Sequence, residues 1–577
     1  MTTKGKIFFT LLIIAIAAIA FWNWSDKILP TTKQTTTQNN TNPAQTQTGA
    51  AKKIATIKEI TSKLLAADQD ARLVGKTAIP PVTGVSKYKL ETKNGKPLVT
   101  FPINIWPGFA PLIVANAGLE PNDNSLFTQH GFYLKITIVD DPVKNRDLYA
   151  SGQTPIMWGT LDMIALFASE LAKDTRTIPN IPMQIDFSAG GDGVVARNGI
   201  HNINDLRPQN GARRQVVVAQ NSPSHFLIMS LLLDARIDPD DIDFKWASDT
   251  PAAAKLYVQD KTLDAFVGFS PDIYTVSEMD PTSRLIVSTQ SANRRIADVF
   301  AIRNDFANDH PEIVQGLVTG ILQGIDKVRA NPEQAAQQLA QAFNLPIADT
   351  RAMIGKDGGI ATGDAHLTNY RENINFYLNP TNPANFEIVY NQAAAIYQSL
   401  GAINKIIPAT QVKYTKALEN AKPHFPDSKD LSQPIFKPGM NFKLEADTEQ
   451  ILTQAIVFNF KPNSTELATD PQTQQYINEV GKTAGSFGRT YIVIEGNTDA
   501  SKRNVVPADE VKKLSYQRAE AVKAAILAKY QFDPDQFKVV GNGWDNPLPG
   551  HTNPANPADN AANRRVEVKI YPLEANE

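Results

Sequence analysis

Between residues 96 and 425, short apolar runs alternate with stretches of helical periodicity, and this alternation limits the possible folds more than any other feature. Strands separated by helices predict an α/β fold with parallel sheets. The predicted strands are 102–106, 133–139, 216–219, 243–246, 265–268, 285–288 and 299–302, and the predicted helices include 224–235, 250–259, 370–377 and 385–400. Because 577 residues exceed what one hydrophobic core supports, we expect two or three domains.

The N-terminal segment indicates export from the cytoplasm. An apolar run at 7–24 is just long enough to span a bilayer, and Lys4 and Lys6 precede it, which predicts a cytoplasmic N-terminus. The aromatic residues that end the run favour an uncleaved anchor, whereas the small residues at 18–20 would suit a signal-peptide cleavage site. We therefore expect 1–27 to be a membrane anchor or a signal peptide.

Composition divides the rest of the chain. Residues 31–48 are almost entirely Thr, Gln, Asn, Pro and Ala, which cannot bury enough surface to offset chain entropy. Asn94-Gly95 lies between alternating apolar and polar residues and predicts a hairpin. Several prolines after 422 mark a second boundary. The expected parts are an anchor at 1–27, a disordered polar linker at 28–51, a helix and hairpin lead-in at 52–97, an α/β domain at 98–421, a Pro-rich connector at 422–446 and a C-terminal α/β domain at 447–577.

The composition also narrows the chemistry. A net charge of -2 argues against a nucleic-acid partner. Seven His and no Cys exclude cysteine-based zinc sites, thiol nucleophiles and disulfides. No Gly-x-Ser-x-Gly elbow of a hydrolase is present. We therefore expect a binding protein rather than an enzyme, with no metal and no cofactor.

Four turns at predicted strand ends favour a ligand cleft. In open α/β sheets, ligands bind beyond the carboxyl ends of strands, where turns expose backbone N–H groups. The turns are 106–111, 158–162, 188–193 and 220–225, and in the last of them Ser222 is placed to cap a helix that starts with proline. The residues of these turns that we expect to bind a solute are Trp106, Gly108, Thr160, Asp162, Ser188, Asp192, Ser222, Ser224 and His225.

The order of these segments resembles the periplasmic solute-binding proteins of nitrate, taurine and sulfonate ABC importers. The resemblance covers about residues 98–345 and rests on 104–111, 149–153, 158–162, 188–199, 221–226 and 301–312. It implies a bilobed type II fold that holds a small solute between two lobes. Some relatives are enzymes that use an active-site His, but His225 has no second metal ligand at suitable spacing, so we expect a binding module.

The charge of the solute stays open at the sequence level. A helix N-terminus at 222–224 and the amides of 190–193 would suit an anion. Asp162, Asp192 and Asp272 lie on the same candidate loops and would repel one, so an amine-bearing or zwitterionic solute is equally expected. Each of these carboxylates could instead cap a helix or join an ion pair.

The last part of the chain, 447–575, resembles the OmpA-like peptidoglycan-binding domain. The motifs are Gly-Asn-Thr-Asp at 496–499, Leu-Ser-Tyr-Gln-Arg-Ala at 514–519 and Asn-Arg-Arg-Val-Glu-Val at 563–568. The resemblance implies that Asp499 binds the ammonium group and Arg518 the carboxylate of diaminopimelate in a stem peptide. It places Asn497, Thr498 and Arg565 in the same site. Predicted strands are 456–460, 491–496, 537–541 and 565–571, and predicted helices are 471–482 and 511–530.

Together these features predict a single-pass inner-membrane protein of a Gram-negative cell envelope, with most of the chain in the periplasm. Its expected partners are peptidoglycan, a small solute, the inner membrane and, if there is one, a membrane protein. The alternative is a stator-type or scaffold subunit of an ion-driven envelope complex, in which the binding fold is a spacer or docking surface. Asp26 lies at the outer edge of the apolar run rather than within it, which weighs against an ion-conducting helix.

Overall fold

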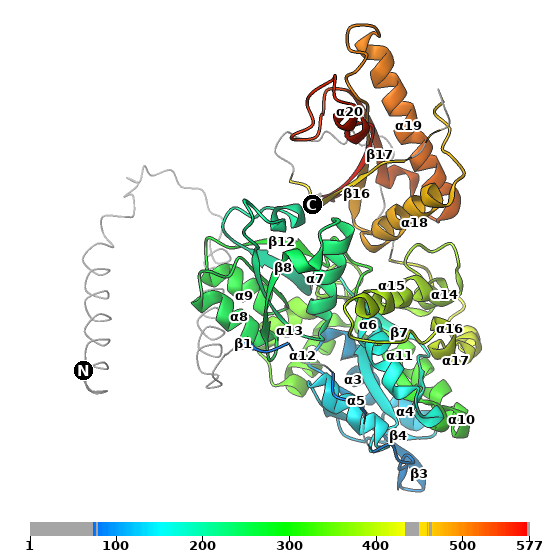
Figure 1. Cartoon of the computed structure of the whole chain (residues 1–577). Coiled ribbons are helices and arrows are strands. Elements are labelled where there is room, and N and C mark those ends of the chain that lie inside the picture. Colours follow the sequence, from blue (N-terminus) through cyan, green and yellow to red (C-terminus); the bar gives the residue numbers. More distant parts are fainter. Residues whose placement is uncertain are drawn as a thin grey trace, which may run out of the picture. The chain divides into compact units, whose positions relative to one another are not determined.

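The computed structural model describes residues 73–76, 79–82, 84–432, 449–458, 460 and 464–573 (Figure 1). The expected anchor at 1–27 and the linker at 28–51 lie outside these ranges, together with parts of the lead-in and the connector. Among the helices of the described ranges, none combines the length and the apolar character that a membrane span requires.

The Asn-Gly hairpin is confirmed. Strands β2 (Glu91–Lys93) and β3 (Lys96–Ile103) pair antiparallel, and Asn94 and Gly95 between them have φ of 51° and 76°, the left-handed conformation that a tight hairpin turn needs. Strand β3 then runs parallel to β4 (Tyr133–Ile138). The strand expected at 102–106 begins earlier and ends at Ile103, because the chain turns into the 3-10 helix η1 (Pro107–Phe109).

The first lobe contains residues 84–188 and 297–432. Its larger sheet has the order β14-β7-β13-β5, with β6 also on β13, and every pairing is antiparallel. These strands are β5 (Ile156–Thr160), β6 (Pro179–Asn180), β7 (Gln184–Ser188), β13 (Ala297–Arg303) and β14 (Ala365–Leu367). The expectation of parallel sheets is wrong here, because β7 leads out of the lobe and its neighbour β13 leads back into it.

Helices surround this sheet and the β2–β3–β4 sheet. They are α3 (Ala110–Asn116), α4 (Leu126–Gln129), α5 (Pro142–Ala150), α6 (Leu161–Leu171), α10 (Asn304–Asp309), α11 (Pro311–Ala330), α12 (Pro332–Phe343), α13 (Ile347–Ile354), α14 (Tyr370–Leu378), α15 (Phe386–Ser399), α16 (Ala409–Val412) and α17 (Lys416–Asn420), with short 3-10 turns η2 (Thr175–Thr177) and η5 (Lys422–His424). The predicted helices at 370–377 and 385–400 correspond to α14 and α15 and are confirmed.

The second lobe is built on a mixed sheet of order β1-β10-β9-β11-β8-β12. Strand β9 is parallel to β10 and β11, as predicted, whereas β8, β12 and β1 run antiparallel to their neighbours. The strands are β1 (Leu73–Val74), β8 (Asp192–Ala196), β9 (Gln215–Ala219), β10 (Asp243–Ala247), β11 (Ala265–Phe269) and β12 (Arg284–Ser288); the helices are α7 (Pro223–Asp234), α8 (Thr250–Gln259) and α9 (Asp272–Met279), with 3-10 turns η3 (Ile203–Leu206) and η4 (Pro239–Asp241).

Alternation along the strands gives this sheet two apolar faces. Helices α8 and α9 cover one face and α7 the other (Figure 1). Val216 and Val218 belong to the core on the α7 side, whereas Val217 packs in a separate cluster with Tyr257 and Ile273 from α8 and α9. A strand whose successive side chains are all buried reads as a continuous apolar run, which is why β9 was recognisable in the sequence.

Two chain crossings connect the lobes. Residues 189–191 join β7 to β8, and residues 289–296 join β12 to β13. The bilobed α/β fold expected from the sequence is therefore present, with both crossings next to the strand ends that carry predicted site residues.

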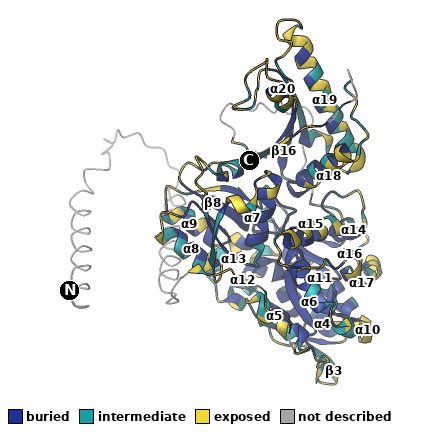
Figure 2. Cartoon of the chain, viewed as in Figure 1, coloured by how far each residue is buried: buried dark blue, intermediate teal, exposed yellow. Residues whose placement is uncertain are grey.

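The C-terminal domain is a four-stranded sheet of order β15-β18-β16-β17, in which β16 and β17 are parallel. Its strands are β15 (Leu452–Ile456), β16 (Thr490–Asn497), β17 (Phe537–Gly543) and β18 (Val566–Pro572); its helices are α18 (Pro471–Ser486), α19 (Ala508–Lys529) and α20 (Pro557–Asn563), with the 3-10 turn η6 (Pro534–Gln536). The strand predicted at 456–460 lies instead at Leu452–Ile456. Every residue of β8 and of β16 is buried (Figure 2).

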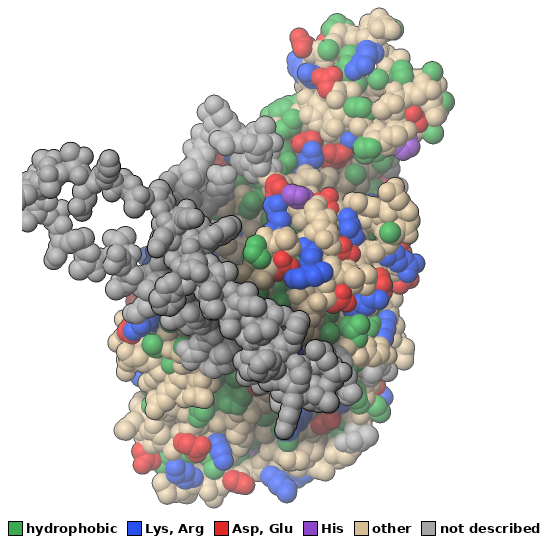
Figure 3. Space-filling view, turned by 90° about the vertical axis from the view of Figure 1, so that its left-hand side faces the viewer, with side chains coloured by type: hydrophobic (Ala, Val, Ile, Leu, Met, Phe, Trp, Pro, Cys, Tyr) green, Lys and Arg blue, Asp and Glu red, His purple; other side chains and the backbone are tan. Residues whose placement is uncertain are grey.

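Surface charges of both signs are mixed. On the face in Figure 3, Lys and Arg side chains alternate with Asp and Glu among the described residues, without a large patch of one sign. This pattern fits the near-neutral net charge of the chain.

Candidate functional site

The first crossing places predicted solute residues at the hinge. The Ser188 hydroxyl donates to Asp192 Oδ2 at 2.7 Å and lies 2.8 Å from Oγ1 of Thr289, which belongs to the other crossing. Thr289 Oγ1 accepts the backbone N–H groups of Gly190 and Asp192, each at 3.0 Å. Ser188 and Asp192 are thus brought together, and Thr289 joins them although no sequence pattern marked it.

Five buried carboxyl groups meet around this point, and we call Asp162, Asp186, Asp192, Asp298 and Asp364 the carboxyl cluster. Asp186 and Asp298 are cross-strand partners on β7 and β13, and their carboxyl groups interact directly. Asp192 lies within electrostatic range of the Asp162, Asp364 and Asp186 carboxyl groups. The sequence predicted only Asp162 and Asp192 of this cluster.

Burial dominates the protonation of the cluster. The pKa of Asp186 and of Asp192 is raised to about 7, first by burial, and for Asp192 the negative charges of neighbouring members contribute to this rise. Burial raises the pKa of Asp162 and of Asp364 to about 6. The pKa of Asp298 lies well above its usual value, first because of burial and then because of the Asp186 charge. The cluster therefore exchanges protons near neutral pH.

No member of the cluster takes part in an ion pair among the described residues. His366 lies within electrostatic range of Asp186, but its ring is hydrogen-bonded to Glu372. The hydrogen-bond donors of the cluster are neutral: Trp106 Nε1 to Asp186 at 3.3 Å, the Ser270 hydroxyl to Asp364 at 2.5 Å and the Tyr397 hydroxyl to Asp162 at 3.3 Å. Asp162 stands in the first turn of α6, after Thr160, the N-cap residue. Neither a helix cap nor an ion pair accounts for these carboxyl groups.

Two glycines allow backbone to approach the cluster closely. A Cβ on Gly108 would lie 1.7 Å from Asp186 Oδ2, so the carboxyl group rests directly on the backbone of η1. A Cβ on Gly191 would lie 2.5 Å from the Trp106 ring. Trp106 of the first lobe therefore packs its ring against Gly191 in the crossing between β7 and β8, and its indole Nε1–H donates to Asp186 of the cluster.

The start of α7 is capped as predicted. Ser222 is the N-cap, its hydroxyl oxygen accepts the N–H of His225 at 3.3 Å, and Pro223 is the first helical residue. The His225 ring is 5.0 Å from that of Trp246, and burial lowers its pKa to about 4, so it is neutral at neutral pH. The buried hydroxyl of Ser224 has no hydrogen-bond partner.

A second site lies in the C-terminal domain. A cavity of about 300 Å³ is lined by Asn497, Ser515, Arg518, Arg564 and Arg565, together with apolar side chains that include Phe460. Gly496 at its edge cannot carry a Cβ, which would lie 2.0 Å from the Ser515 carbonyl oxygen. This tight packing of β16 on α19 fixes the two motifs that supply the cavity.

Arg518 projects from α19, and few polar groups of the described chain contact its guanidinium group. Its guanidinium group lies 4.9 Å from the centre of the Phe460 ring, and its Nη2 is 3.5 Å from the Ser464 carbonyl oxygen. Its Nε has no hydrogen-bond partner among the described residues. Burial and then the charge of Arg564 lower its pKa, while the Asp499 carboxylate acts in the opposite direction. Arg518 is thus a cation open to an anionic group in the cavity.

Asp499 is paired with Arg564, not with Arg518. Arg564 Nη1 lies 2.9 Å from Asp499 Oδ2, and the Ser501 N–H and hydroxyl donate to Oδ1. Although burial opposes ionisation, the Ser501 and Arg564 hydrogen bonds keep the pKa of Asp499 below its usual value. Arg564 is a site residue that the sequence reasoning missed, although it lies in the closing Asn-Arg-Arg motif.

The other predicted residues of this site have structural partners. Arg565 forms an ion pair with Glu567 at 2.5 Å, and Asn497 accepts a hydrogen bond from Asn542 at 3.1 Å. The backbone N–H of Thr498 donates to the Gly543 carbonyl at 2.7 Å. These contacts hold the wall of the cavity in place.

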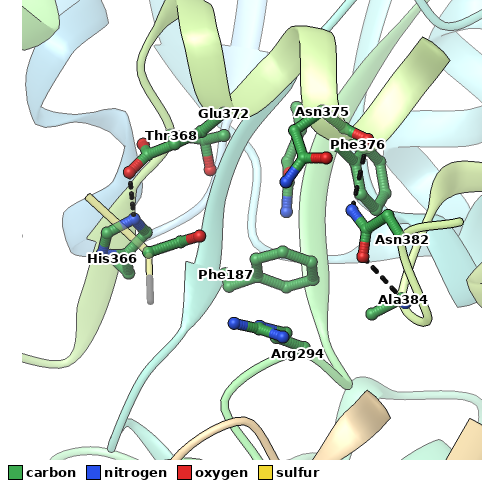
Figure 4. A pocket seen from close by; sticks show the side chains of 11 residues that line it. Phe187, Arg294, His366, Thr368, Glu372, Asn375, Phe376, Asn382 and Ala384 are labelled. Carbon is green, nitrogen blue, oxygen red and sulfur yellow. Dashed lines mark hydrogen bonds and ion pairs between the residues drawn. The ribbon is translucent and has the colours of Figure 1, made fainter. Parts of the chain in front are cut away.

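A smaller cavity lies in the first lobe. It measures about 20 Å³, room for about one water molecule, and is lined by polar groups that include His366, Glu372, Asn382 and Arg294 (Figure 4). His366 is hydrogen-bonded to Glu372 at 3.1 Å. Within the described ranges, no group of three or more His, Asp and Glu residues is arranged to hold a metal ion.

Several solved structures are similar to part of this chain. The periplasmic aliphatic sulphonate-binding protein of Escherichia coli is 15% identical, with 60% of this chain and 98% of that chain covered and a TM-score of 0.42. The nitrate-binding protein of Synechocystis is 12% identical, with 58% and 89% covered and a TM-score of 0.42. The desulfurization enzyme DSZB is 12% identical, with 57% and 99% covered and a TM-score of 0.40. At these values the neighbours carry no information on ligand or activity.

Among curated proteins, none matches this sequence. Residues 459–564 match the model of the OmpA family, and they contain β16, α19 and all the polar residues of the 300 Å³ cavity except Arg565. The C-terminal part of the chain thus matches the OmpA family, and it follows a bilobed α/β domain.

Proposed function

We propose that this chain is a cell-envelope protein that docks non-covalently on peptidoglycan through its C-terminal domain and binds a small solute between its two lobes. The apolar run at 7–24 would anchor it in the inner membrane, with the domains in the periplasm. The observation that carries the proposal is the cavity of the OmpA family domain, which is lined by Arg518; this side chain has no ion-pair partner among the described residues and lies within electrostatic range of Asp499.

The charges of the cavity match a zwitterion. The free end of diaminopimelate has an ammonium and a carboxylate on one carbon, and Arg518 can take the carboxylate as a two-pronged donor. Asp499 can take the ammonium when its bond to Arg564 opens or is shared. A stem peptide with lysine lacks this carboxylate, would leave Arg518 unpaired and should bind more weakly.

Sedimentation of the full chain with purified sacculi tests the wall-binding part. We expect the chain to pellet with sacculi that contain diaminopimelate, and the variants Asp499→Ala and Arg518→Ala to remain largely in the supernatant. Lys513→Ala is the matched control, because Lys513 is exposed on the same helix and does not line the cavity. Equal pelleting of all four proteins would exclude this site as the wall contact.

The solute-binding part is supported by the hinge. Residues from both crossings and both lobes surround a buried polar cluster at the place where a bilobed receptor encloses its ligand. The hydroxyl–carboxyl pairs of the cluster, Ser188–Asp192 and Ser270–Asp364, are buried, and His225 is neutral and packed against Trp246. We therefore assign the cleft to binding.

A further inference from the structure

We propose that the solute held between the lobes is an organic amine, whose protonated nitrogen binds to the carboxyl cluster. This inference rests on the proposed function, since it names the class of solute for the same cleft. It goes beyond the sequence-level expectation, which left anions and amines open.

The cluster lies where closure of the lobes would trap a ligand. Asp162, Asp186, Asp298 and Asp364 belong to the first lobe, whereas Asp192 begins β8 of the second. Further contacts tie the second lobe to this point, since the Ser270 hydroxyl donates to Asp364 and the Ser270 N–H to the Gly191 carbonyl at 2.6 Å. The carboxyl groups are therefore assembled from both sides of the hinge.

Within the described ranges the cluster has no ion-pair partner and an incomplete set of hydrogen-bond donors, although His366 lies within electrostatic range of Asp186. The cluster's hydrogen-bond partners in the described chain are indole and hydroxyl groups, none of them charged. Asp192 Oδ1 is buried without any hydrogen-bond partner, and so is the Ser224 hydroxyl. A buried carboxylate without a counter-charge is unfavourable, and an ammonium group supplies both the charge and up to three donors.

Aromatic side chains border the same place. The Trp106 ring lies against Gly191, the Tyr274 hydroxyl donates to the Gly190 carbonyl at 2.8 Å, and Tyr397 is bonded to Asp162. Aromatic rings next to carboxylates are favourable surroundings for an alkyl ammonium group, because the ring faces attract cations and the rings also cover the alkyl part.

An anion would find most of the expected donors already engaged, although the buried Ser224 hydroxyl has no partner among the described residues. The N–H groups of Gly190 and Asp192 donate to Thr289, and that of Ala189 donates to the Asp364 carbonyl at 2.9 Å. At the start of α7, the Ser222 hydroxyl donates to the Ala219 carbonyl at 2.7 Å. A metal ion is disfavoured as well, since the carboxyl groups are not arranged as a metal-holding set within the described ranges.

Thermal unfolding and titration calorimetry of the full chain separate the possible solutes. The amine probes are ethanolamine, putrescine, spermidine and lysine; the anion probes are ethanesulfonate and nitrate. We expect at least one amine to raise the melting temperature and to bind, and neither anion to do so. Binding of an anion without an amine would overturn the amine assignment and leave the proposed receptor intact. Binding of no probe by a chain that still pellets with sacculi would overturn both and favour the scaffold alternative.

Substitutions locate the amine on the cluster. Asp192→Asn and Asp162→Asn keep the side-chain size and remove one negative charge each, so we expect affinity for the bound amine to fall roughly ten-fold to a hundred-fold. Asp240→Asn is the matched control, because Asp240 is exposed in the second lobe. Two independent positions keep the test decisive if one variant fails to fold. Unchanged affinity in a folded Asp192 or Asp162 variant would place the amine elsewhere and overturn the assignment.

Discussion

Replacing Asp192 by Asn should stabilise the ligand-free chain at pH 8 and have little effect at pH 4.5. In the folded chain burial raises the pKa of Asp192 to about 7, whereas an Asp side chain in the unfolded chain titrates near 4. Between these values the folded chain holds a proton that the unfolded chain has lost. The free energy of unfolding therefore falls as the pH rises through this window.

The size of the effect follows from the two pKa values. A difference between about 4 and about 7 corresponds to about 4 kcal/mol of lost stability above pH 7. Asparagine cannot ionise, and its carbonyl oxygen can still accept the Ser188 hydroxyl hydrogen bond. The buried NH₂ group of the new asparagine needs a hydrogen-bond acceptor, and this requirement offsets part of the gain in the free energy of unfolding. We expect a net gain of about 1–4 kcal/mol at pH 8 and less than about 1 kcal/mol at pH 4.5.

Thermal unfolding at the two pH values measures this difference. At pH 8 the Asp192→Asn variant should melt roughly 2–10 °C above the wild-type chain, with near coincidence at pH 4.5. Asp240→Asn controls for the loss of an exposed charge in the same lobe and should shift little at either pH. A lower melting temperature for Asp192→Asn at pH 8, or an equal shift at both pH values, would show that the buried carboxyl group is not a source of strain.

The structure predicts the effects of three further substitutions on stability or amine affinity. Gly324→Ala should lower stability by about 1–3 kcal/mol in denaturant unfolding, because the new Cβ would lie 2.2 Å from the Pro111 carbonyl oxygen and force α11 away from α3. Ser222→Ala should cost about 1 kcal/mol by the same assay, since it removes the N-cap of α7; no loss would mean that Pro223 and the helix packing suffice. Trp106→Phe should weaken amine binding several-fold in calorimetry, because it keeps an aromatic ring and loses the Nε1 donor to the cluster. Unchanged affinity would show that the indole nitrogen takes no part in amine binding.

Local features of the fold were predictable from the sequence. The Asn94-Gly95 turn, the Ser222 cap and helix α8 depend on a few consecutive residues, and the structure has them where they were expected. The OmpA family domain was recognisable because its motifs are short and specific. The antiparallel sheet of the first lobe was not, because strand direction there depends on where the chain crosses to the second lobe and returns.

The composition of the cleft was only partly predictable for the same reason. Asp162 closely follows a predicted strand, and Asp192 lies in a glycine-rich turn, so a few consecutive residues were enough to predict both. Asp186, Asp298 and Asp364 lie in unremarked segments and meet only through the pairing of β7 with β13 and β14. An isolated Asp has no pattern that distinguishes a cluster member from a surface residue, so tertiary pairing alone brings these carboxyl groups together.

The two sites differ in how their charges are balanced before a ligand arrives. Near the C-terminal cavity the Asp499 carboxylate is already paired with Arg564, so a diaminopimelate ammonium would have to replace or share that partner. In the cleft the carboxyl groups have only neutral donors, and burial keeps them partly protonated. An amine bound there would supply the ion-pair partner that the carboxyl groups lack among the described residues, and the carboxyl groups would release protons on binding it. Wall attachment is thus expected to be independent of solute, whereas closure of the lobes on an amine should strengthen as the pH rises from about 6 to about 8 and the carboxyl groups ionise.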